Sequence, residues 1–236
     1  MGKDSIYTAE IHGNGFTFDD KVASVFADMI SRSVPGYGLT LQMVELLSHQ
    51  YAQPHSRLYD LGSSLGAATM ALARGATGKD CTVIGVDNSE AMVERCREIL
   101  KGEPVEIVCG DILKAKVDDA SLVVLNFVLQ FIAKDHRMTL LQQIHAGLNP
   151  GGVLILSEKI AFEDPVENRQ QIALHEAFKR AQGYSELEIS RKRTALENVL
   201  IPETLPVHLA RLKEAGFSHA QVWFQCFNFA SIVAYR

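Results

Sequence analysis

Apolar side chains recur at two different spacings along this chain, and the first spacing is helical. Between residues 22 and 30, apolar residues fall at i, i+3, i+4, i+7 and i+8, which predicts an amphipathic helix. Asp19 or Asp20 stands where an N-cap is expected, and Pro35-Gly36 ends the helix. A second helix is predicted over residues 39–47, where the leucines keep the same spacing.

Short apolar runs alternate with helical patterns through the middle of the chain. Strands are predicted over residues 57–61, 82–87, 106–109, 121–127 and 152–158, with helices between them over 67–74, 90–100 and 135–148. After a further helix over 207–215, two closing strands are predicted over 220–226 and 231–235. Strands that alternate with helices are typical of an α/β fold with a mainly parallel sheet.

The segment after the fifth strand interrupts this alternation. Residues 166–200 have a helical pattern throughout, and Ser185 with Glu188 forms a capping-box motif at the start of a second helix there. We therefore predict one α/β domain over residues 19–236, with a helical insert at about 160–200 that shapes a substrate pocket.

Composition sets limits on class and compartment. Of 236 residues, 47% are hydrophobic and 22% are charged, a balance typical of a globular protein. No apolar run approaches the roughly 20 residues that span a bilayer. Residues 1–18 lack the apolar stretch of a secretory signal, so we expect an N-terminal arm there and a cytoplasmic protein away from any membrane. The four cysteines are scattered, which favours reduced, mostly buried thiols and no metal site.

The charge of the chain bears on its partners. The formal net charge is −5, and the only basic run is Arg191-Lys192-Arg193. Proteins that hold nucleic acid usually present a strongly basic surface, because neutralisation of phosphates dominates affinity. We therefore expect a small-molecule substrate and no direct binding of tRNA.

The first predicted strand ends in a turn of small residues. Leu61-Gly62-Ser63-Ser64-Leu65-Gly66 joins this strand to the next helix. Small residues let a ligand approach the backbone, and the helix N-terminus offers free N–H groups to it. The turn indicates a nucleotide-type ligand, with a tight turn that only packs the helix closely as the alternative.

An acidic residue ends the second predicted strand. Asp87, followed by Asn88, stands where a carboxylate commonly accepts hydrogen bonds from a ribose diol. Its alternative role is the N-cap of the helix that begins at Glu90. The turn at Gly62 and this carboxylate together favour a ligand that contains ribose.

Three features favour S-adenosylmethionine over a nicotinamide cofactor. The turn lacks the compact G-x-G-x-x-G pattern. The third strand ends in Gly110-Asp111-Ile112, which resembles the adenine-contacting element of class I methyltransferases. The Pro150-Gly151-Gly152 turn and the closing strand pair resemble the late sheet of that superfamily. The resemblance implies its Rossmann-like fold with a seven-stranded sheet.

A closer resemblance extends over nearly the whole chain. It is carried by FDD at 18–20, RSVPGY at 32–37, LNF at 125–127, LSEK at 156–159, FKRAQGYSELE at 178–188, KR at 192–193, LENV at 196–199 and WFQCFNF at 223–229. These blocks resemble the bacterial carboxy-S-adenosyl-L-methionine synthase family. Ser63 departs from the family pattern, which has Cys at that position, and a small polar residue there is expected to keep the turn.

The resemblance implies a reaction other than methyl transfer. Prephenate would lose CO2 and its ring hydroxyl to give phenylpyruvate, and the CO2 would be captured on the methyl carbon of S-adenosylmethionine. The sulfonium acidifies the adjacent C–H, so the deprotonated methyl is a carbon nucleophile. The resemblance also implies a homodimer, whose product, carboxy-S-adenosyl-L-methionine, passes to a tRNA carboxymethyltransferase that modifies the wobble uridine.

By the same resemblance, the cofactor is lined by Gly62, Ser63, Ser64, Asp87, Asn88, Asp111, Ile112 and Asn126. Tyr37 and Arg193 are implied as the catalytic residues that also hold the extra carboxylate, and a guanidinium suits this because it gives a carboxylate two parallel hydrogen bonds. The local pattern alone leaves Arg193 open as a solvated helix residue, and Tyr37 as a turn residue packed on the second helix. Arg32 is a further candidate for contact with prephenate.

Two other functions stay open at this point. The first is a conventional methyltransferase that acts on a small molecule or tRNA. The second is a catalytically silent module that sequesters S-adenosylmethionine, against which the helical insert and an arginine on the methyl side both argue.

Overall fold

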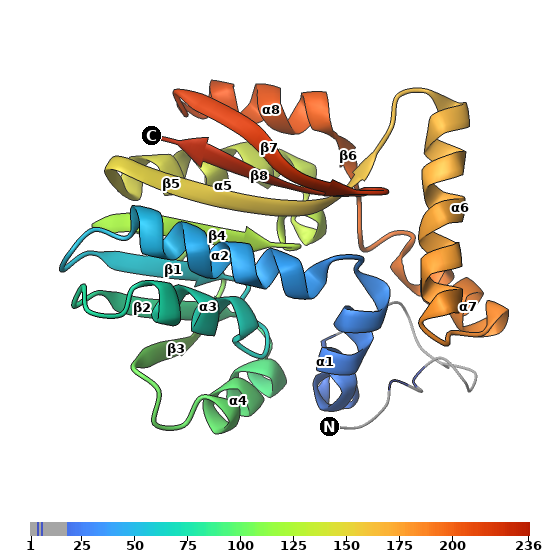
Figure 1. Cartoon of the computed structure of the whole chain (residues 1–236), viewed down its shortest axis with the longest axis horizontal. Coiled ribbons are helices and arrows are strands. Elements are labelled where there is room, and N and C mark those ends of the chain that lie inside the picture. The colour runs from blue at the N-terminus through green and yellow to red at the C-terminus, as the bar shows by residue number, and fades with distance from the viewer. Residues whose placement is uncertain (1–3, 5, 7–17) are drawn as a thin grey trace.

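The structure is a computed structural model that describes Asp4, Ile6 and residues 18–236 (Figure 1). In chain order its elements are α1 (Asp20–Ser33), α2 (Tyr37–Tyr51), β1 (Arg57–Leu61), α3 (Ala67–Gly75), β2 (Thr82–Asp87), α4 (Glu90–Ile99), β3 (Val105–Cys109), β4 (Ala120–Asn126), the 3-10 helix η2 (Leu129–Phe131), α5 (Lys134–Gly147), β5 (Leu148–Ala161), α6 (Pro165–Ala181), α7 (Glu186–Leu196), β6 (Glu203–Thr204), α8 (Leu205–Glu214), β7 (His219–Cys226) and β8 (Phe229–Tyr235). Most of the predicted N-terminal arm lies outside the described residues.

A mixed sheet forms the centre of the molecule, in the strand order β3-β2-β1-β4-β5-β8-β7. β1 to β5 pair in parallel, whereas β8 is antiparallel to both β5 and β7. The α/β fold and the path of seven strands are therefore confirmed. An eighth strand, β6, pairs with the end of β5, and with two residues it is too short to show a period in the sequence.

Helices cover both faces of the sheet (Figure 1). On one face α2 and α3 bury Val44 and Leu72 against the sheet, and on the other face α5 and α8 bury Ile144 and Leu212. Six of the seven residues of β4 are buried. A parallel strand with both faces covered is expected to be a continuous apolar run, and this explains why β4 lacks alternation in the sequence.

Side-chain caps fix the ends of several helices where the sequence predicts them. Asp19 caps α1, because its carboxylate accepts a hydrogen bond from the backbone N–H of Val22 at 3.0 Å. Ser185 and Glu188 form the predicted capping box of α7, in which the Glu188 carboxylate accepts from the Ser185 N–H at 2.8 Å. These caps satisfy N–H groups that a helix leaves unpaired at its start.

The predicted insert is formed by α6 and α7, which lie beyond the carboxyl end of β5 (Figure 1). The pattern predicts helix throughout residues 166–200, but the structure differs. α6 ends at Ala181, and α7 ends at Leu196. Gly183 lies between them with φ of +86°, a left-handed conformation that commonly ends a helix.

The cysteines differ from the expectation of mostly buried thiols. All four are free, but only Cys96 is buried, and Cys109 is exposed. The reason is position, since Cys109 ends β3, which is an edge strand of the sheet. No helix within the described residues is long and apolar enough to cross a membrane.

Candidate cofactor and substrate site

The carboxyl ends of the parallel strands meet at one edge of the sheet, where α/β proteins commonly bind ligands. The structure places the eight predicted cofactor residues along this edge: Gly62, Ser63 and Ser64 after β1, Asp87 and Asn88 at the end of β2, Asp111 and Ile112 after β3, and Asn126 at the end of β4. Short contacts tie neighbouring loops together, because the Gly110 N–H donates to the Asp87 carbonyl at 2.9 Å and the Gly62 N–H donates to the Val86 carbonyl at 2.7 Å.

The turn after β1 requires glycine at its first position. Gly62 has φ of +89°, and a Cβ atom there would lie 2.4 Å from Cγ2 of Val128. A side chain at residue 62 would therefore clash with the turn after β4. The close approach of these two turns is a packing reason for Gly62, and it also leaves the backbone of the turn accessible to a ligand.

Asp87 is held by backbone donors. Its Oδ2 accepts from the Ser64 N–H at 2.8 Å, and its Oδ1 accepts from the Ser89 N–H at 2.9 Å. Burial raises the pKa of Asp87, while these two hydrogen bonds lower it. The N-cap of α4 is Ser89, so Asp87 does not have the capping role that the sequence left open. A carboxylate has about four acceptor positions, and these two hydrogen bonds use two of them.

Among the buried oxygens that have no hydrogen-bond partner within the described residues are Asp60 Oδ1, Ser63 Oγ and Asn126 Oδ1, which lie at this edge. Leaving such a group unpaired costs about 1–3 kcal/mol. Asp60 accepts from Thr69 through its other oxygen at 2.7 Å, and burial together with the charge of Asp87 raises its pKa to about 6. The unpaired acceptors fit a ligand rich in donors, and S-adenosylmethionine carries an ammonium and ribose hydroxyls.

Tyr37 lies beside this edge as the first residue of α2. Its ring centroid is 6.5 Å from that of Phe127, which follows β4 with a φ of 63°. Burial raises the pKa of Tyr37, and the negative charge of Asp60 raises it further. The phenol is therefore neutral and available as a hydrogen-bond donor at neutral pH.

A buried carboxyl group supports the turn after β4. Glu158 Oε1 accepts from the Leu129 N–H at 2.9 Å, and its side chain is almost fully buried. Burial raises the pKa of Glu158 to about 8, although the charge of Arg137 lowers it. In this turn Val128 packs against Gly62. Glu158 therefore holds in place the turn that contacts the Gly62 loop.

Arg193 lies apart from the cofactor residues, on α7. Its Nη1 donates to Glu176 Oε1 of α6 at 2.9 Å, and 62% of its side chain is exposed. Within the described residues, no hydrogen bond, ion pair or ring contact joins Arg193 to Tyr37. We call the edge of the sheet that carries the eight predicted cofactor residues the cofactor edge. The structure places Tyr37 beside this edge and Arg193 in the insert, and their shared role stays a prediction.

Arg32 is engaged by other parts of the protein. It forms an ion pair with Asp28 at 2.7 Å and donates to the backbone oxygen of Asp4 at 3.0 Å. Its guanidinium also lies over the ring of Tyr184, 4.2 Å from the centroid. These contacts give Arg32 a structural role between α1 and the insert, and its contact with prephenate stays a prediction.

Sequence reasoning missed several charged groups near this edge. Asp60, Lys159 and Lys179 carried no assigned role, although the last two lie inside the blocks on which the family resemblance rests. Lys179 has only 7% of its surface exposed. Lysine is almost never that buried without a partner, but burial cannot be read from one amphipathic segment.

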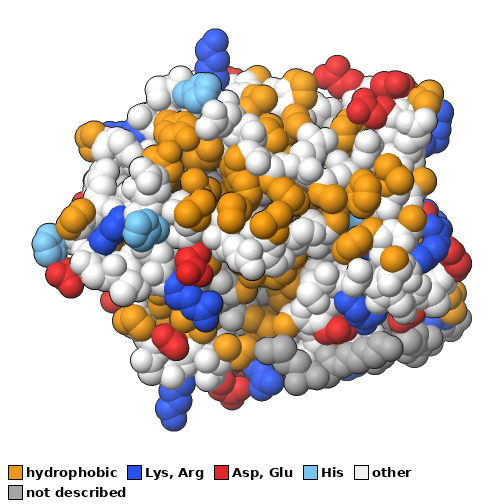
Figure 2. Space-filling model, viewed as in Figure 1, with side chains coloured by type: hydrophobic (Ala, Val, Ile, Leu, Met, Phe, Trp, Pro, Cys, Tyr) orange, Lys and Arg blue, Asp and Glu red, His pale blue; other side chains and the backbone are white. Residues whose placement is uncertain are grey.

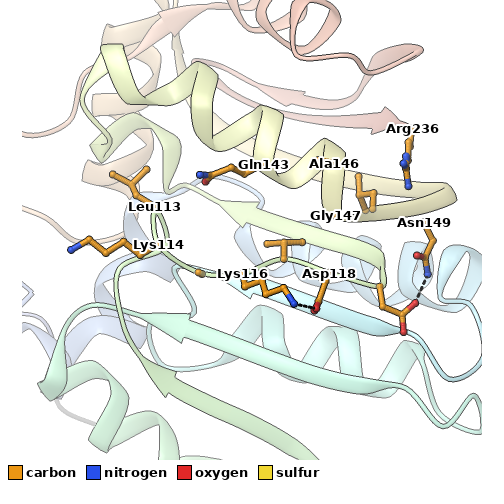
Figure 3. Close-up of a pocket in the computed structure, with 13 residues that line it drawn as sticks. Leu113, Lys114, Lys116, Asp118, Gln143, Ala146, Gly147, Asn149 and Arg236 are labelled. Carbon is orange, nitrogen blue, oxygen red and sulfur yellow. Dashed lines mark hydrogen bonds and ion pairs between the residues drawn. The ribbon is translucent and has the colours of Figure 1, made fainter.

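A cavity of about 570 Å³ lies elsewhere, at the opposite edge of the sheet (Figure 3). It is lined by the segment before β4, the last turn of α5, the start of β5 and Arg236. Within it Lys116 pairs with Asp118 at 2.8 Å, and Asn149 donates to Asp119 at 2.9 Å. None of the predicted site residues lines this cavity.

The fold and the cofactor edge define a class of protein. Residues 58–152 match a family described as "Methyltransferase domain". Human N-acetylserotonin methyltransferase, solved in complex with SAM, superposes with a TM-score of 0.62 at 17% identity, over 92% of this chain and 55% of that longer chain. An O-methyltransferase family protein from Burkholderia thailandensis superposes with a TM-score of 0.65 at 17% identity, over 93% of this chain and 60% of that chain. The chain has the class I SAM-dependent methyltransferase fold.

Sequence relatives narrow the class. The chain is 55% identical to a carboxy-S-adenosyl-L-methionine synthase of Trichlorobacter lovleyi over 99% of this chain and 98% of the relative. It is 53% identical to the protein of the same name from Aliivibrio salmonicida, with the same coverage. The chain belongs to the carboxy-S-adenosyl-L-methionine synthase family.

Replacement of Asp87 tests the cofactor edge. Asp87→Ala removes a charged acceptor, so we expect the affinity for S-adenosylmethionine to fall by about 1–3 kcal/mol. Titration calorimetry on the folded variant measures this loss. Asp135→Ala, at an exposed residue of α5, is the matched control and should bind as the wild type does. An unchanged affinity in Asp87→Ala would reduce Asp87 to a residue that only holds the turn.

Proposed function

We propose that this protein makes carboxy-S-adenosyl-L-methionine from S-adenosyl-L-methionine and prephenate, with release of phenylpyruvate. The observation that carries the proposal is the identity of 52–55% to relatives of that name over nearly the whole chain. The proposal also draws on the sequence blocks outside the generic methyltransferase elements, because the resemblance to the family rests on those blocks.

The proposed reaction balances without a further reagent. Prephenate loses its ring carboxylate as CO2 and its ring hydroxyl as hydroxide, and the ring becomes aromatic. The hydroxide takes a proton from the S-methyl group and leaves as water. The carbon so formed attacks CO2, and the new carboxylate stays on the methyl carbon. A base from the protein is not required, which agrees with the lack of an obvious base among the residues that the resemblance implies.

The proposed roles follow from chemistry and position. The eight cofactor residues bind S-adenosylmethionine, with Asp87 accepting from ribose and Asn126 accepting from the ammonium. The phenolic O–H of Tyr37 donates a hydrogen bond to the new carboxylate. Arg193 exchanges Glu176, its partner at 2.9 Å, for that carboxylate, because the planar guanidinium can form two parallel hydrogen bonds with it.

The proposal extends to partners. A homodimer is implied by the family, and apolar side chains are exposed on α2 and β7: Leu39 and Leu46 on the helix and Val222 on the strand. Figure 2 shows hydrophobic side chains gathered across the middle of the face on which Figure 1 shows these two elements. We assign the protein to the cytoplasm, where its product passes to a tRNA carboxymethyltransferase. The net charge of −5 supports a role without direct binding of tRNA.

Activity is tested with the two proposed substrates. Purified protein incubated with S-adenosylmethionine and prephenate should release phenylpyruvate and form a cofactor that is heavier by one carboxyl group. Mass spectrometry and the absorbance of phenylpyruvate measure both products. Prephenate consumed no faster than without the enzyme contradicts the proposal, and methyl transfer to a small molecule or tRNA supports the conventional methyltransferase instead.

Arg193→Ala tests the arginine that the family resemblance singles out. The variant should lose about 30-fold or more in affinity for carboxy-S-adenosyl-L-methionine, because loss of one partner of a charge pair costs about 2–5 kcal/mol. Affinity for S-adenosylmethionine, which lacks the carboxylate, should stay within about 3-fold. Arg193→Lys should recover only part of the lost affinity for carboxy-S-adenosyl-L-methionine, because an ammonium cannot form the two parallel hydrogen bonds of a guanidinium.

The two affinities also separate the other outcomes. Equal weakening toward both ligands means that Arg193 supports the insert through Glu176. An effect on neither ligand returns Arg193 to a solvated residue of α7.

A further inference from the structure

We propose that Lys159 and Lys179 form an anion-binding pair between the sheet and the insert, which takes a carboxylate of the second, ring-containing substrate. The inference rests on the proposed function, and it assigns residues and a substrate class to a part of the site that the cofactor does not occupy. It differs from the role of Arg193, which concerns the carboxylate of the product.

The two lysines come from different elements and lie close enough to repel each other. Val153 and Ile155 of β5 pack with the core under α2 and α3. Alternate residues of a strand share a face, so Ser157 and Lys159 lie on that face as well. Lys179 comes from α6. His175, one turn before Lys179 on α6, has its ring 4.8 Å from that of Phe229, the cross-strand neighbour of Lys159, so the two lysines lie in one region. In agreement with this, the charge of Lys159 is, after burial, the largest cause of the lowered pKa of Lys179.

Lys179 is buried and Lys159 is partly buried, and neither has a counter-ion of its own among the residues described. Only 7% of the surface of Lys179 is exposed. Neither ammonium has a hydrogen bond or ion pair with any residue that the structure describes. Burial lowers the pKa of Lys179 to about 8, and the charge of Lys159 adds to this. Charges that burial partly desolvates are costly when unpaired, so the region favours a bound anion.

Nearby acidic groups are already engaged. Glu176 accepts from Arg193 at 2.9 Å and also pairs with Arg180 at 3.7 Å. Asp4 lies 4.0 Å from Lys192 and accepts from the hydroxyl of Tyr184 at 2.6 Å. The negative charge of Glu176 raises the pKa of both Lys159 and Lys179, but its ion pairs are with Arg193 and Arg180 and with neither of these lysines.

His175 adds no positive charge at neutral pH. Burial, followed by the charges of Lys179 and Lys159, lowers the pKa of His175 to about 3. Its Nε2 donates to the Ser33 carbonyl at 2.8 Å. This hydrogen bond orients the neutral ring beside the lysines.

A row of rings connects this pair with the cofactor edge. The His175 ring lies 4.8 Å from Phe229, which lies 5.9 Å from Phe127, which in turn lies 6.5 Å from Tyr37. Phe229 is also the cross-strand neighbour of Lys159. An apolar wall with cations at one end and the cofactor at the other suits a small unsaturated ring that carries a carboxylate.

Methionine substitutions test the pair, because methionine keeps the apolar stem and removes the charge. In Lys159→Met and in Lys179→Met, we expect KM for prephenate to rise by about 10-fold or more. Affinity for S-adenosylmethionine by calorimetry should stay within about 3-fold. Lys179→Arg, which keeps the charge, should recover most of the loss. Lys213→Met, at an exposed residue of α8, is the control and should match the wild type.

A binding measurement separates this inference from the proposed function. Phenylpyruvate is titrated into the protein saturated with S-adenosylhomocysteine, so that no turnover is needed. Weaker binding in both methionine variants than in the wild type supports the pair, even if prephenate is not consumed and the proposed function fails. No binding to the wild type, or equal binding to the wild type and both folded variants, overturns the pair.

Discussion

The parallel strands β1 to β5 end at one edge of the sheet, and the rest of the site depends on this constraint. Buried polar groups lie close together there because the parallel strands all end at this edge. Glu158 supports the turn after β4 through the Leu129 N–H at 2.9 Å, and that turn packs Val128 against Gly62. The cofactor edge is thus shaped by buried contacts, while acceptors such as Asn126 Oδ1 are left without a partner among the described residues.

The helical insert carries two cations to which the proposals give different roles. Arg193 is mostly exposed and paired with Glu176, whereas Lys179 is buried and has no such partner within the described chain. An exposed pair is worth little and can be exchanged, while a buried cation favours a ligand of opposite charge. This difference suits two tasks that the proposed reaction needs, which are to hold a charged substrate and to retain a charged product.

Much of the fold is predictable from local pattern. Apolar runs and helical spacing locate the seven long strands, and the motif at Ser185 predicts the cap of α7. β6 escapes prediction because two residues carry no period. Cys109 is exposed because β3 is an edge strand. The order of strands in the sheet determines this, and local sequence does not show it.

The site is predictable to a lesser degree. The turn at Gly62 and the position of Asp87 at the end of a predicted strand together favour a ligand in the sequence, whereas the choice of Ser89 as the helix cap follows only from the hydrogen bonds. The role given to Arg193 rests on resemblance to the family alone, because its helix shows no reason to single it out. Glu158 and Lys179 require the fold, since their burial results from contacts between segments far apart in the sequence.

Carbon labelling tests the central claim, that the carboxylate of the product comes from the second substrate. Prephenate labelled with 13C in its ring carboxylate is supplied with S-adenosylmethionine, and the product is analysed by mass spectrometry. The account predicts carboxy-S-adenosyl-L-methionine that carries the label in its new carboxyl group, even when unlabelled bicarbonate is in excess. A product without the label, or label found only in free CO2, would contradict it.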